Sequence, residues 1–219
     1  AAVESTDVVV LAVKSYDTEQ AMADIAPYLA SSSETKVLTV QNGLGNAETI
    51  HEFVQADRIL AGTTTNGAYI EEPGLVRHTG WGQTTIGRMW GEPDRFVEAL
   101  ATAFRESGFE TAVVGDIEHA IWEKVLVNVG INPITALARV PNGRLNDDPS
   151  GEALLESAVR EAVAVARAEG HEFETDPIER TTTDDGPLTT DDYCVLHPLR
   201  PEKKAFRDHH RSGFSVARR

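Results

Sequence analysis

The first half of the chain alternates between short apolar runs and segments with helical periodicity. Residues 8–13 are an unbroken, valine-rich apolar run, which is typical of a strand buried on both faces of a sheet. Residues 18–29 repeat apolar side chains at helical spacing, and 36–40 and 58–64 are again strand-like. A short helix over 47–54 lies between the last two runs. This alternation predicts βαβ units and a parallel sheet.

The pattern continues through four further elements. Residues 74–78 and 84–87 predict two strands joined by a turn that contains glycine, 92–107 predict an amphipathic helix, and 110–114 predict another strand. Asp17 is a candidate N-cap for the first helix, because its carboxylate can accept from free backbone N–H groups. All of these segments fit an α/β domain.

Strand signals stop after Asp116, and the following segments have helical spacing. Asp116 can cap a long helix that runs toward Arg139. A second helix is expected over 151–169, with Gly170 marking its end, and the polar residues 141–150 predict a loop between the two. The chain is therefore expected to continue as a helical domain.

These elements divide the chain into an α/β part over residues 1–115 and an all-α part over 116–192. Residues 193–219 differ from both, since they hold seven Lys or Arg and two acids, whereas the first 192 residues hold 13 bases and 33 acids. Three explanations stay open: a basic interaction tail, a disordered terminus, or out-of-frame translation.

The composition restricts the classes of partner. A formal net charge of −15 argues against a basic surface for nucleic acid or for an anionic membrane. The 35 acids face 15 arginines and only 5 lysines, a balance that fits a halophilic protein whose self-repulsion is screened by salt. An ordinary acidic cytoplasmic protein is the alternative.

The single cysteine, Cys194, excludes an intrachain disulfide, and no thiolate metal site is expected. The longest apolar runs are far shorter than a membrane span, and the chain does not open with the pattern of a signal peptide. We therefore expect a cytoplasmic protein with no bound metal and no membrane contact.

Three polar side chains interrupt the apolar pattern of the first long helix. Lys124, Asn128 and Asn132 lie at i, i+4 and i+8, so at about 100° per residue they share one face. A cation and two amides are costly in a buried helix unless a polar group meets them, and a small oxygen-rich substrate would do so. The alternative is a surface lysine beside asparagines that bond the local backbone. The spacing alone leaves both open.

Asn42 is a second candidate, because it follows a strand at the carboxyl edge where α/β sheets bind ligands. The pair Asn42-Gly43 is also a strong turn signal, so turn chemistry is the alternative.

Four motifs follow one another along the chain. They are Val13-Lys14 at the end of a strand, Gln41-Asn42-Gly43-Leu44-Gly45, His78-x-Gly80-x-Gly82-x3-Ile86-Gly87, and Lys124-x3-Asn128-x3-Asn132-Pro133-x-Thr135-Ala136 with Pro141-Asn142-Gly143 after it. In this order they resemble those of the 2-dehydropantoate 2-reductase (ketopantoate reductase) family. The resemblance covers roughly residues 7–170. It implies a partial Rossmann-like parallel-sheet domain followed by a helical, 6-phosphogluconate dehydrogenase-like C-terminal domain.

The resemblance also implies roles for individual residues. Lys124 would be the catalytic general acid at the substrate ketone, and Asn128, Asn132 and Asn142 would line the substrate pocket. Negative charge grows on the ketone oxygen during reduction, so an adjacent ammonium group stabilises it and can donate a proton. Burial among apolar residues should lower the pKa of Lys124.

On the cofactor side, the resemblance implies that Asn42 lies near both the nicotinamide and the substrate and that Lys14 contacts the cofactor. The implied reaction is the NADPH-dependent reduction of 2-dehydropantoate to pantoate in pantothenate biosynthesis, with a small 2-oxo acid as substrate. The helical domain would bind substrate and support a homodimer.

Two family segments are not found in the sequence. Residues 1–7 resemble the middle of the family's first domain, so we expect the opening strand and its Gly-x-Gly-x-x-Gly turn to be missing, as in a fragment. The serine and glutamate motifs expected near the end are absent from 193–219. Three alternatives to the reductase therefore stay open: a related reductase of another 2-oxo acid, a catalytically inactive fragment, or a more distant dehydrogenase of the same architecture.

Overall fold

The computed structural model describes residues 6–140, 142–147 and 149–182 of the chain. These residues separate into two compact units. The first consists of 6–66 and 82–121, and the second of 67–81 and 122–182. The basic segment 193–219, with the explanations left open for it and with Cys194, lies outside the described residues.

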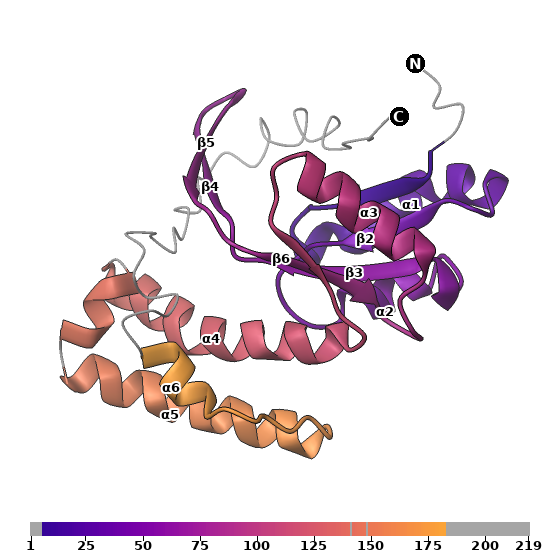
Figure 1. Cartoon of the computed structure of the whole chain (residues 1–219). Helices are drawn as coiled ribbons and strands as arrows, with labels where there is room; N and C mark the ends of the chain where they lie inside the picture. The colour runs from indigo at the N-terminus through magenta and orange to yellow at the C-terminus, as the bar shows by residue number, and fades with distance from the viewer. Residues whose placement is uncertain (1–5, 141, 148, 183–219) are drawn as a thin grey trace. The chain divides into compact units, whose positions relative to one another are not determined.

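A five-stranded sheet in the order β1-β2-β3-β6-β7 forms the centre of the first unit (Figure 1). Its strands are β1 (Val8–Leu11), β2 (Lys36–Thr39), β3 (Ile59–Thr64), β6 (Thr84–Arg88) and β7 (Thr111–Val113). Neighbouring strands are parallel except β3 and β6, which run antiparallel. The predicted α/β class is confirmed, and the predicted parallel sheet is found with β6 added antiparallel to β3.

Helices cover both faces of this sheet, which explains the continuous apolar strands. The helices are α1 (Thr18–Ser31), α2 (Asn46–His51) and α3 (Arg95–Glu106). Val37 and Ile59 pack with α1 and α2, whereas Leu38 and Leu60, one residue further along, pack with α3. Successive residues of a strand point to opposite faces, so a strand with helices on both sides must be apolar throughout.

The β4–β5 hairpin was not anticipated. Strand β5 (Leu75–Gly80) pairs antiparallel with β4 (Gly67–Glu72), and not with β6 as the sequence pattern predicted. Tyr69 and Ile70 of β4 are exposed. Because neither face of β4 is buried, its sequence lacks the alternation that marks a half-buried strand.

Local side chains cap the starts of two helices, α3 and α4, but not that of α1. Asp94 accepts from the backbone N–H groups of Phe96 and Val97 at 3.0 and 3.1 Å, so α3 starts at Arg95, later than predicted. Asp116 caps helix α4 (Ile117–Ala138) as predicted, accepting from the N–H of His119 at 2.8 Å. Asp17 precedes α1 but makes no side-chain cap bond, so that prediction was wrong.

The second unit has its own core between α4, α5 (Pro149–Ala168) and α6 (Pro177–Thr182). Leu126, Leu155 and Val159 are fully buried in it. The short 3-10 helix η3 (Asn142–Asp147) occupies most of the predicted loop. Gly170 ends α5 as predicted: its φ is +95°, and the next N–H returns to the carbonyl of Ala166 at 3.0 Å.

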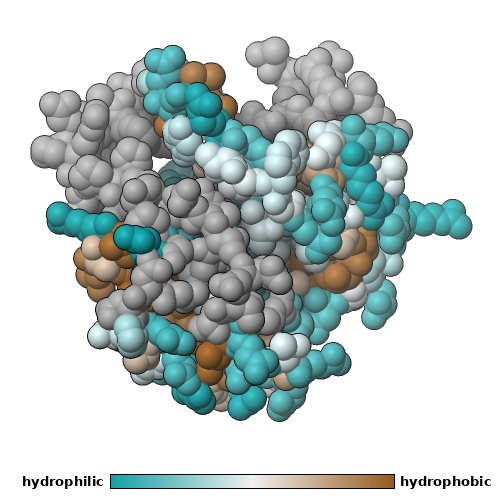
Figure 2. All heavy atoms as spheres, turned by 60° about the vertical axis from the view of Figure 1, so that its left-hand side comes forward, coloured by the Kyte–Doolittle hydropathy of each residue, from teal (hydrophilic) through white to brown (hydrophobic). Residues whose placement is uncertain are grey.

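The described atoms on the face drawn in Figure 2 are largely hydrophilic and are interrupted by small apolar patches. No helix in the described part of the chain is long and apolar enough to cross a membrane.

Candidate active site

The cofactor-side candidates Lys14 and Asn42 lie at the carboxyl edge of the sheet in the first unit. Lys14 follows β1 and Asn42 follows β2, and both side chains are exposed. Because β1 and β2 are parallel, their carboxyl ends meet at the same edge, where α/β sheets bind ligands. An ammonium group and an amide presented there can bond phosphate and carboxamide groups.

The loop after β2 follows a path that glycine permits. Gly43 and Gly45 have φ values of +93° and +83°, in the left-handed region that other residues rarely adopt. This loop leads directly into α2 at Asn46, so Asn42 and the start of α2 are separated by three residues.

Sequence reasoning missed the polar side chains that support this edge from inside. Gln41 bonds to both Val13 and Thr18, and Asn46 bonds to the backbone of Asn42 and Gly43. Thr18 and Asn46 are 1% and 6% exposed. The only sequence signal for them is their place next to the Lys14 and Asn42 motifs.

Lys124 is half-buried on α4 in the second unit. Burial away from water disfavours its ammonium form and lowers its pKa from 10.5 to about 8. The lowered pKa expected from the sequence is therefore found. A lysine with this pKa is still mostly protonated at neutral pH, yet it releases its proton more easily than a lysine in water.

The amides of Asn128 and Asn132 lie on the next turns of the same helix and are also half-buried. Each step of four residues advances roughly 6 Å along the axis. The structure thus places the three predicted polar groups at partly covered positions of one helix.

Asn142 lies in the segment that follows α4. The helix ends where Arg139 adopts a left-handed φ of 58° and the N–H of Val140 returns to the carbonyl of Thr135 at 3.2 Å. Asn142 then opens η3, and its Oδ1 atom is buried with no hydrogen-bond donor among the described residues. A buried amide oxygen without a donor is costly, so a bound hydroxyl or ammonium group would stabilise it.

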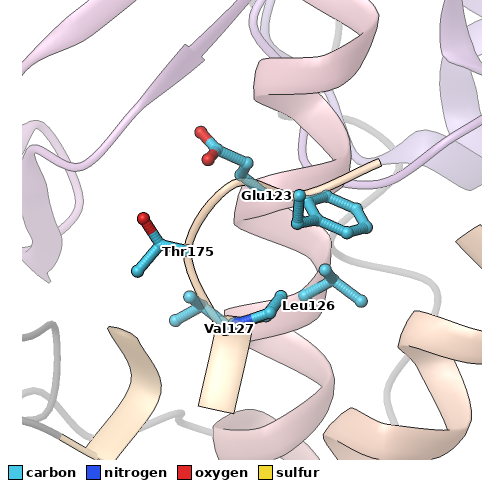
Figure 3. A pocket seen from close by; sticks show the side chains of 6 residues that line it. Glu123, Leu126, Val127 and Thr175 are labelled. Atoms are coloured by element: carbon cyan, nitrogen blue, oxygen red, sulfur yellow. The ribbon is translucent and has the colours of Figure 1, made fainter. Parts of the chain in front are cut away.

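A small pocket of the second unit lies beside another face of α4 (Figure 3). It has a volume of about 230 Å³ including the open solvent at its mouth, and Glu123, Leu126, Val127, Phe173, Thr175 and Pro177 line it. Figure 3 shows the oxygens of Glu123 and Thr175 on the same side in the view. None of the predicted substrate residues lines this pocket.

Lys124, Asn128, Asn132 and Asn142 thus belong to the second unit, whereas Lys14 and Asn42 belong to the first. Within the described ranges, no group of three or more His, Cys, Asp or Glu residues is arranged to hold a metal ion.

Comparisons with known proteins match two family models to successive parts of the chain. Residues 1–91 match the family model described as ketopantoate reductase PanE/ApbA, and residues 116–193 match the model of its C-terminal part. The chain is 51% identical over 178 residues to 2-dehydropantoate 2-reductase from Halobacterium salinarum, a match that covers 81% of this chain and 58% of that protein.

Two solved structures share the fold. One is the ternary structure of D-mandelate dehydrogenase with NADH and anilino(oxo)acetate, with a TM-score of 0.76 and 26% identity over 81% of this chain and 57% of that one. The other is 2-dehydropantoate 2-reductase from Geobacter metallireducens, with a TM-score of 0.73 and 29% identity over 80% of this chain and 60% of that one.

A sheet domain followed by helices is the fold of the solved 2-dehydropantoate 2-reductase that the chain resembles. The chain belongs to the ketopantoate reductase PanE/ApbA family. It spans 58% of the length of the curated Halobacterium relative that it matches.

Proposed function

We propose that this chain takes part in the NADPH-dependent reduction of 2-dehydropantoate to pantoate. The observation that supports this most directly is Lys124, a half-buried lysine with a pKa of about 8 on a helix that also carries Asn128 and Asn132. Family membership and the 51% identity to a 2-dehydropantoate 2-reductase support the choice of substrate.

In this mechanism Lys124 acts as the general acid. Reduction of a ketone adds a hydride to carbon and a proton to oxygen, and the oxygen gains negative charge as the hydride arrives. The ammonium group of Lys124 stabilises that charge and donates the proton to the oxygen. The lowered pKa makes the transfer easier while leaving most of the lysine protonated at neutral pH.

The asparagines would hold the substrate without adding charge. Asn128 and Asn132 can donate to its carboxylate through their amide N–H groups and accept from its hydroxyl through their oxygens. Asn142 would use its buried Oδ1 atom to accept from a substrate hydroxyl. Each role predicts a loss of substrate affinity when the amide is removed.

Lys14 and Asn42 would hold the cofactor, which supplies the hydride when bound. A cationic and an amide side chain at the carboxyl edge of a sheet fit the phosphates and the carboxamide of a nicotinamide dinucleotide. The resemblance favours NADPH, and the solved D-mandelate dehydrogenase structure contains NADH, so both cofactors need to be compared.

Two alternatives rest on specific observations. The likeness to D-mandelate dehydrogenase favours a related reductase of another 2-oxo acid. The chain spans 58% of the length of the Halobacterium relative, and a chain that is inactive by itself is the second alternative. Substrate comparison separates the first alternative from our proposal, and cofactor binding without turnover would identify the second.

The test is the oxidation of NADPH by the purified chain, followed by absorbance with 2-dehydropantoate and with other 2-oxo acids such as phenylglyoxylate. We expect 2-dehydropantoate to give the highest kcat/KM. Lys124→Ala should lower that value by about 10²- to 10⁴-fold, as expected for loss of a general acid. Lys36→Ala, a lysine at the start of β2 in the first unit, is the matched control and should keep it. Equal turnover by the Lys124 variant would overturn the mechanism.

We also propose that the helical unit supports a homodimer. Leu137, Leu154 and Val165 leave large apolar side chains 82%, 54% and 53% exposed on α4 and α5. Contact between two copies would remove this apolar surface from water. Sedimentation analysis of the full chain tests it, and a monomer at micromolar concentration would contradict it.

A further inference from the structure

The structure assigns a positioning role to Gln41, Thr18 and Asn46. We infer that these three side chains, here called the edge network, hold the segments bearing Lys14 and Asn42 in one fixed arrangement. The inference rests on the proposed function in that this arrangement serves the cofactor. None of the three residues needs to touch the cofactor itself.

Gln41 joins the ends of the first two strands. Its Nε2 atom donates to the carbonyl oxygen of Val13 at 2.8 Å and to the Oγ1 atom of Thr18 at 2.8 Å. Its Oε1 atom accepts from the hydroxyl of Thr39 at 3.0 Å. Only the amide nitrogen can donate to a carbonyl, so the orientation of this side chain is fixed by chemistry. Val13 directly precedes Lys14, and Gln41 directly precedes Asn42.

Thr18 links Gln41 to Asn46, which bonds the loop that contains Gly43 and Gly45. Because it accepts from Gln41, its own proton is free to donate to the Oδ1 atom of Asn46 at 3.4 Å. The Nδ2 atom of Asn46 donates to the carbonyl oxygens of Asn42 and Gly43 at 3.2 and 3.3 Å. The side chains therefore connect the backbone before Lys14 to the backbone of Asn42.

The edge network is costly to break because it is buried. Thr18, Thr39 and Asn46 are each less than 7% exposed, so water cannot easily replace a lost partner. The loop itself holds Gly43 and Gly45 in left-handed conformations, which other residues rarely adopt. The side chain of Asn42 is exposed, whereas its backbone carbonyl accepts a hydrogen bond from the buried side chain of Asn46.

The decisive experiment compares Thr18→Val with Thr18→Ser in the full chain. Valine keeps the shape of threonine but can neither accept from Gln41 nor donate to Asn46, whereas serine keeps the hydroxyl. Two quantities are measured: the dissociation constant for NADPH, by fluorescence titration, and amide hydrogen exchange over residues 42–46 without cofactor.

We expect Thr18→Val to weaken NADPH binding and to speed exchange over 42–46, each about 5- to 30-fold, the range that corresponds to losing one or two hydrogen bonds. Thr18→Ser should restore both values to near those of the wild type. Thr102→Val, a threonine on α3 whose hydroxyl bonds the carbonyl of Glu98, is the matched control and should change neither.

A second network variant and a variant of reduced stability test whether the effects come from general destabilisation. Gln41→Glu keeps the bond from Thr39 but cannot donate to Val13 or Thr18, so it should reproduce both effects. Val97→Ala, a core change on α3, serves as a variant of reduced stability, and it should leave the exchange of 42–46 and the NADPH affinity at wild-type values below its melting temperature. An equal effect of Val97→Ala would overturn the inference.

The outcomes separate this inference from the proposed function. Suppose that the wild-type chain binds NADPH and that Thr18→Val changes neither this binding nor the exchange over 42–46. The edge network is then overturned, and the proposed function remains. If the wild-type chain binds no NADPH, the proposed function fails for this chain, and the exchange measurement alone decides: faster exchange over 42–46 in Thr18→Val supports the network, and unchanged exchange overturns it.

Discussion

Gly130 of α4 lies so close to Val159 of α5 that a methyl group on Gly130 would sit 2.7 Å from the Cγ2 atom of Val159. Leu155 and Thr181 would also be within 3.4 Å of that methyl group, so helices from three parts of the second unit meet at this glycine. The close approach fixes the rotation of α4 about its axis. It therefore determines which way Lys124 and Asn128, on neighbouring turns, can face.

Replacing this glycine tests the packing. Gly130→Ala should lower the free energy of unfolding by about 1–3 kcal/mol, since an extra methyl group in a packed core forces neighbours apart. Alanine is otherwise the better helix former by about 1 kcal/mol, so a loss must come from the clash. Denaturant unfolding measures the change. Gly115→Ala is the control, because its methyl group would meet only the carboxylate of Glu92, at 3.5 Å. A stabilised Gly130→Ala protein would show that α4 and α5 lie further apart.

The pH dependence of turnover should report the pKa of Lys124. The protonated form is the acid, so kcat/KM for ketone reduction should fall as pH rises through about 8. In Lys124→Arg the side chain stays protonated, so the fall near pH 8 should disappear even though turnover is reduced. A fall near pH 8 that persists in Lys124→Arg would assign it to another group.

The same lysine should affect stability with the opposite dependence. In the unfolded chain Lys124 has a pKa near 10.5, and in the folded protein it is about 8. Between these values the unfolded chain binds more protons, so the free energy of unfolding should rise with pH across this window. Below pH 8 the buried charge opposes folding in full. Lys124→Met should therefore be more stable than the wild type at pH 7, and the difference should shrink between pH 8 and 10.5. Chemical unfolding at several pH values measures it.

The sheet could be predicted where burial leaves a local pattern. Strands β1 to β3 carry unbroken apolar runs because helices cover both faces, and those runs were found within two residues of the strand bounds. The pairing partner of β6 could not be predicted, because an antiparallel neighbour and a parallel one bury the same side chains. Strand β4 gave no pattern, since Tyr69 and Ile70 face solvent.

The candidate site, like the sheet, could be predicted only where the sequence carries a local pattern. The burial of Lys124 followed from its apolar neighbours along one helix, so the direction of its pKa shift could be predicted. The edge network could not, because Gln41 bonds to residues 23 and 28 positions away. A hydrogen bond between distant segments depends on the folded path of the chain, and a single sequence carries no local signal for it.

Asp94 should contribute to stability as the cap of α3. Burial alone would raise the pKa of its carboxyl, but hydrogen bonds from Arg88 and from the backbone of Val97 and Phe96 more than offset this and lower the pKa. The contribution should be complete above the unfolded pKa near 3.8 and should be lost as pH falls below it. Asp94→Ala should cost about 0.5–2 kcal/mol at pH 7 in chemical unfolding. Asp94→Asn, which keeps an oxygen acceptor, should cost less, and equal costs would assign the effect to the ion pair with Arg88.

Salt tests whether the acidic composition is an adaptation. With a net charge of −15, self-repulsion opposes folding at low ionic strength, and added potassium chloride should raise the melting temperature. Screening alone is nearly complete at 1 M, where the Debye length is about 3 Å, so an ordinary acidic protein should gain most of its stability below roughly 0.5 M.

A halophilic protein should continue to gain stability at molar salt, because screening of charge repulsion is not the only way in which salt stabilises its acidic surface. The choice of chloride matters, since sulfate strengthens apolar burial in any protein by being excluded from its surface. Thermal unfolding from about 0.05 to 3 M potassium chloride therefore separates the two explanations. A melting temperature that levels off below 1 M would identify an ordinary acidic protein, and a continued rise would support the halophilic one.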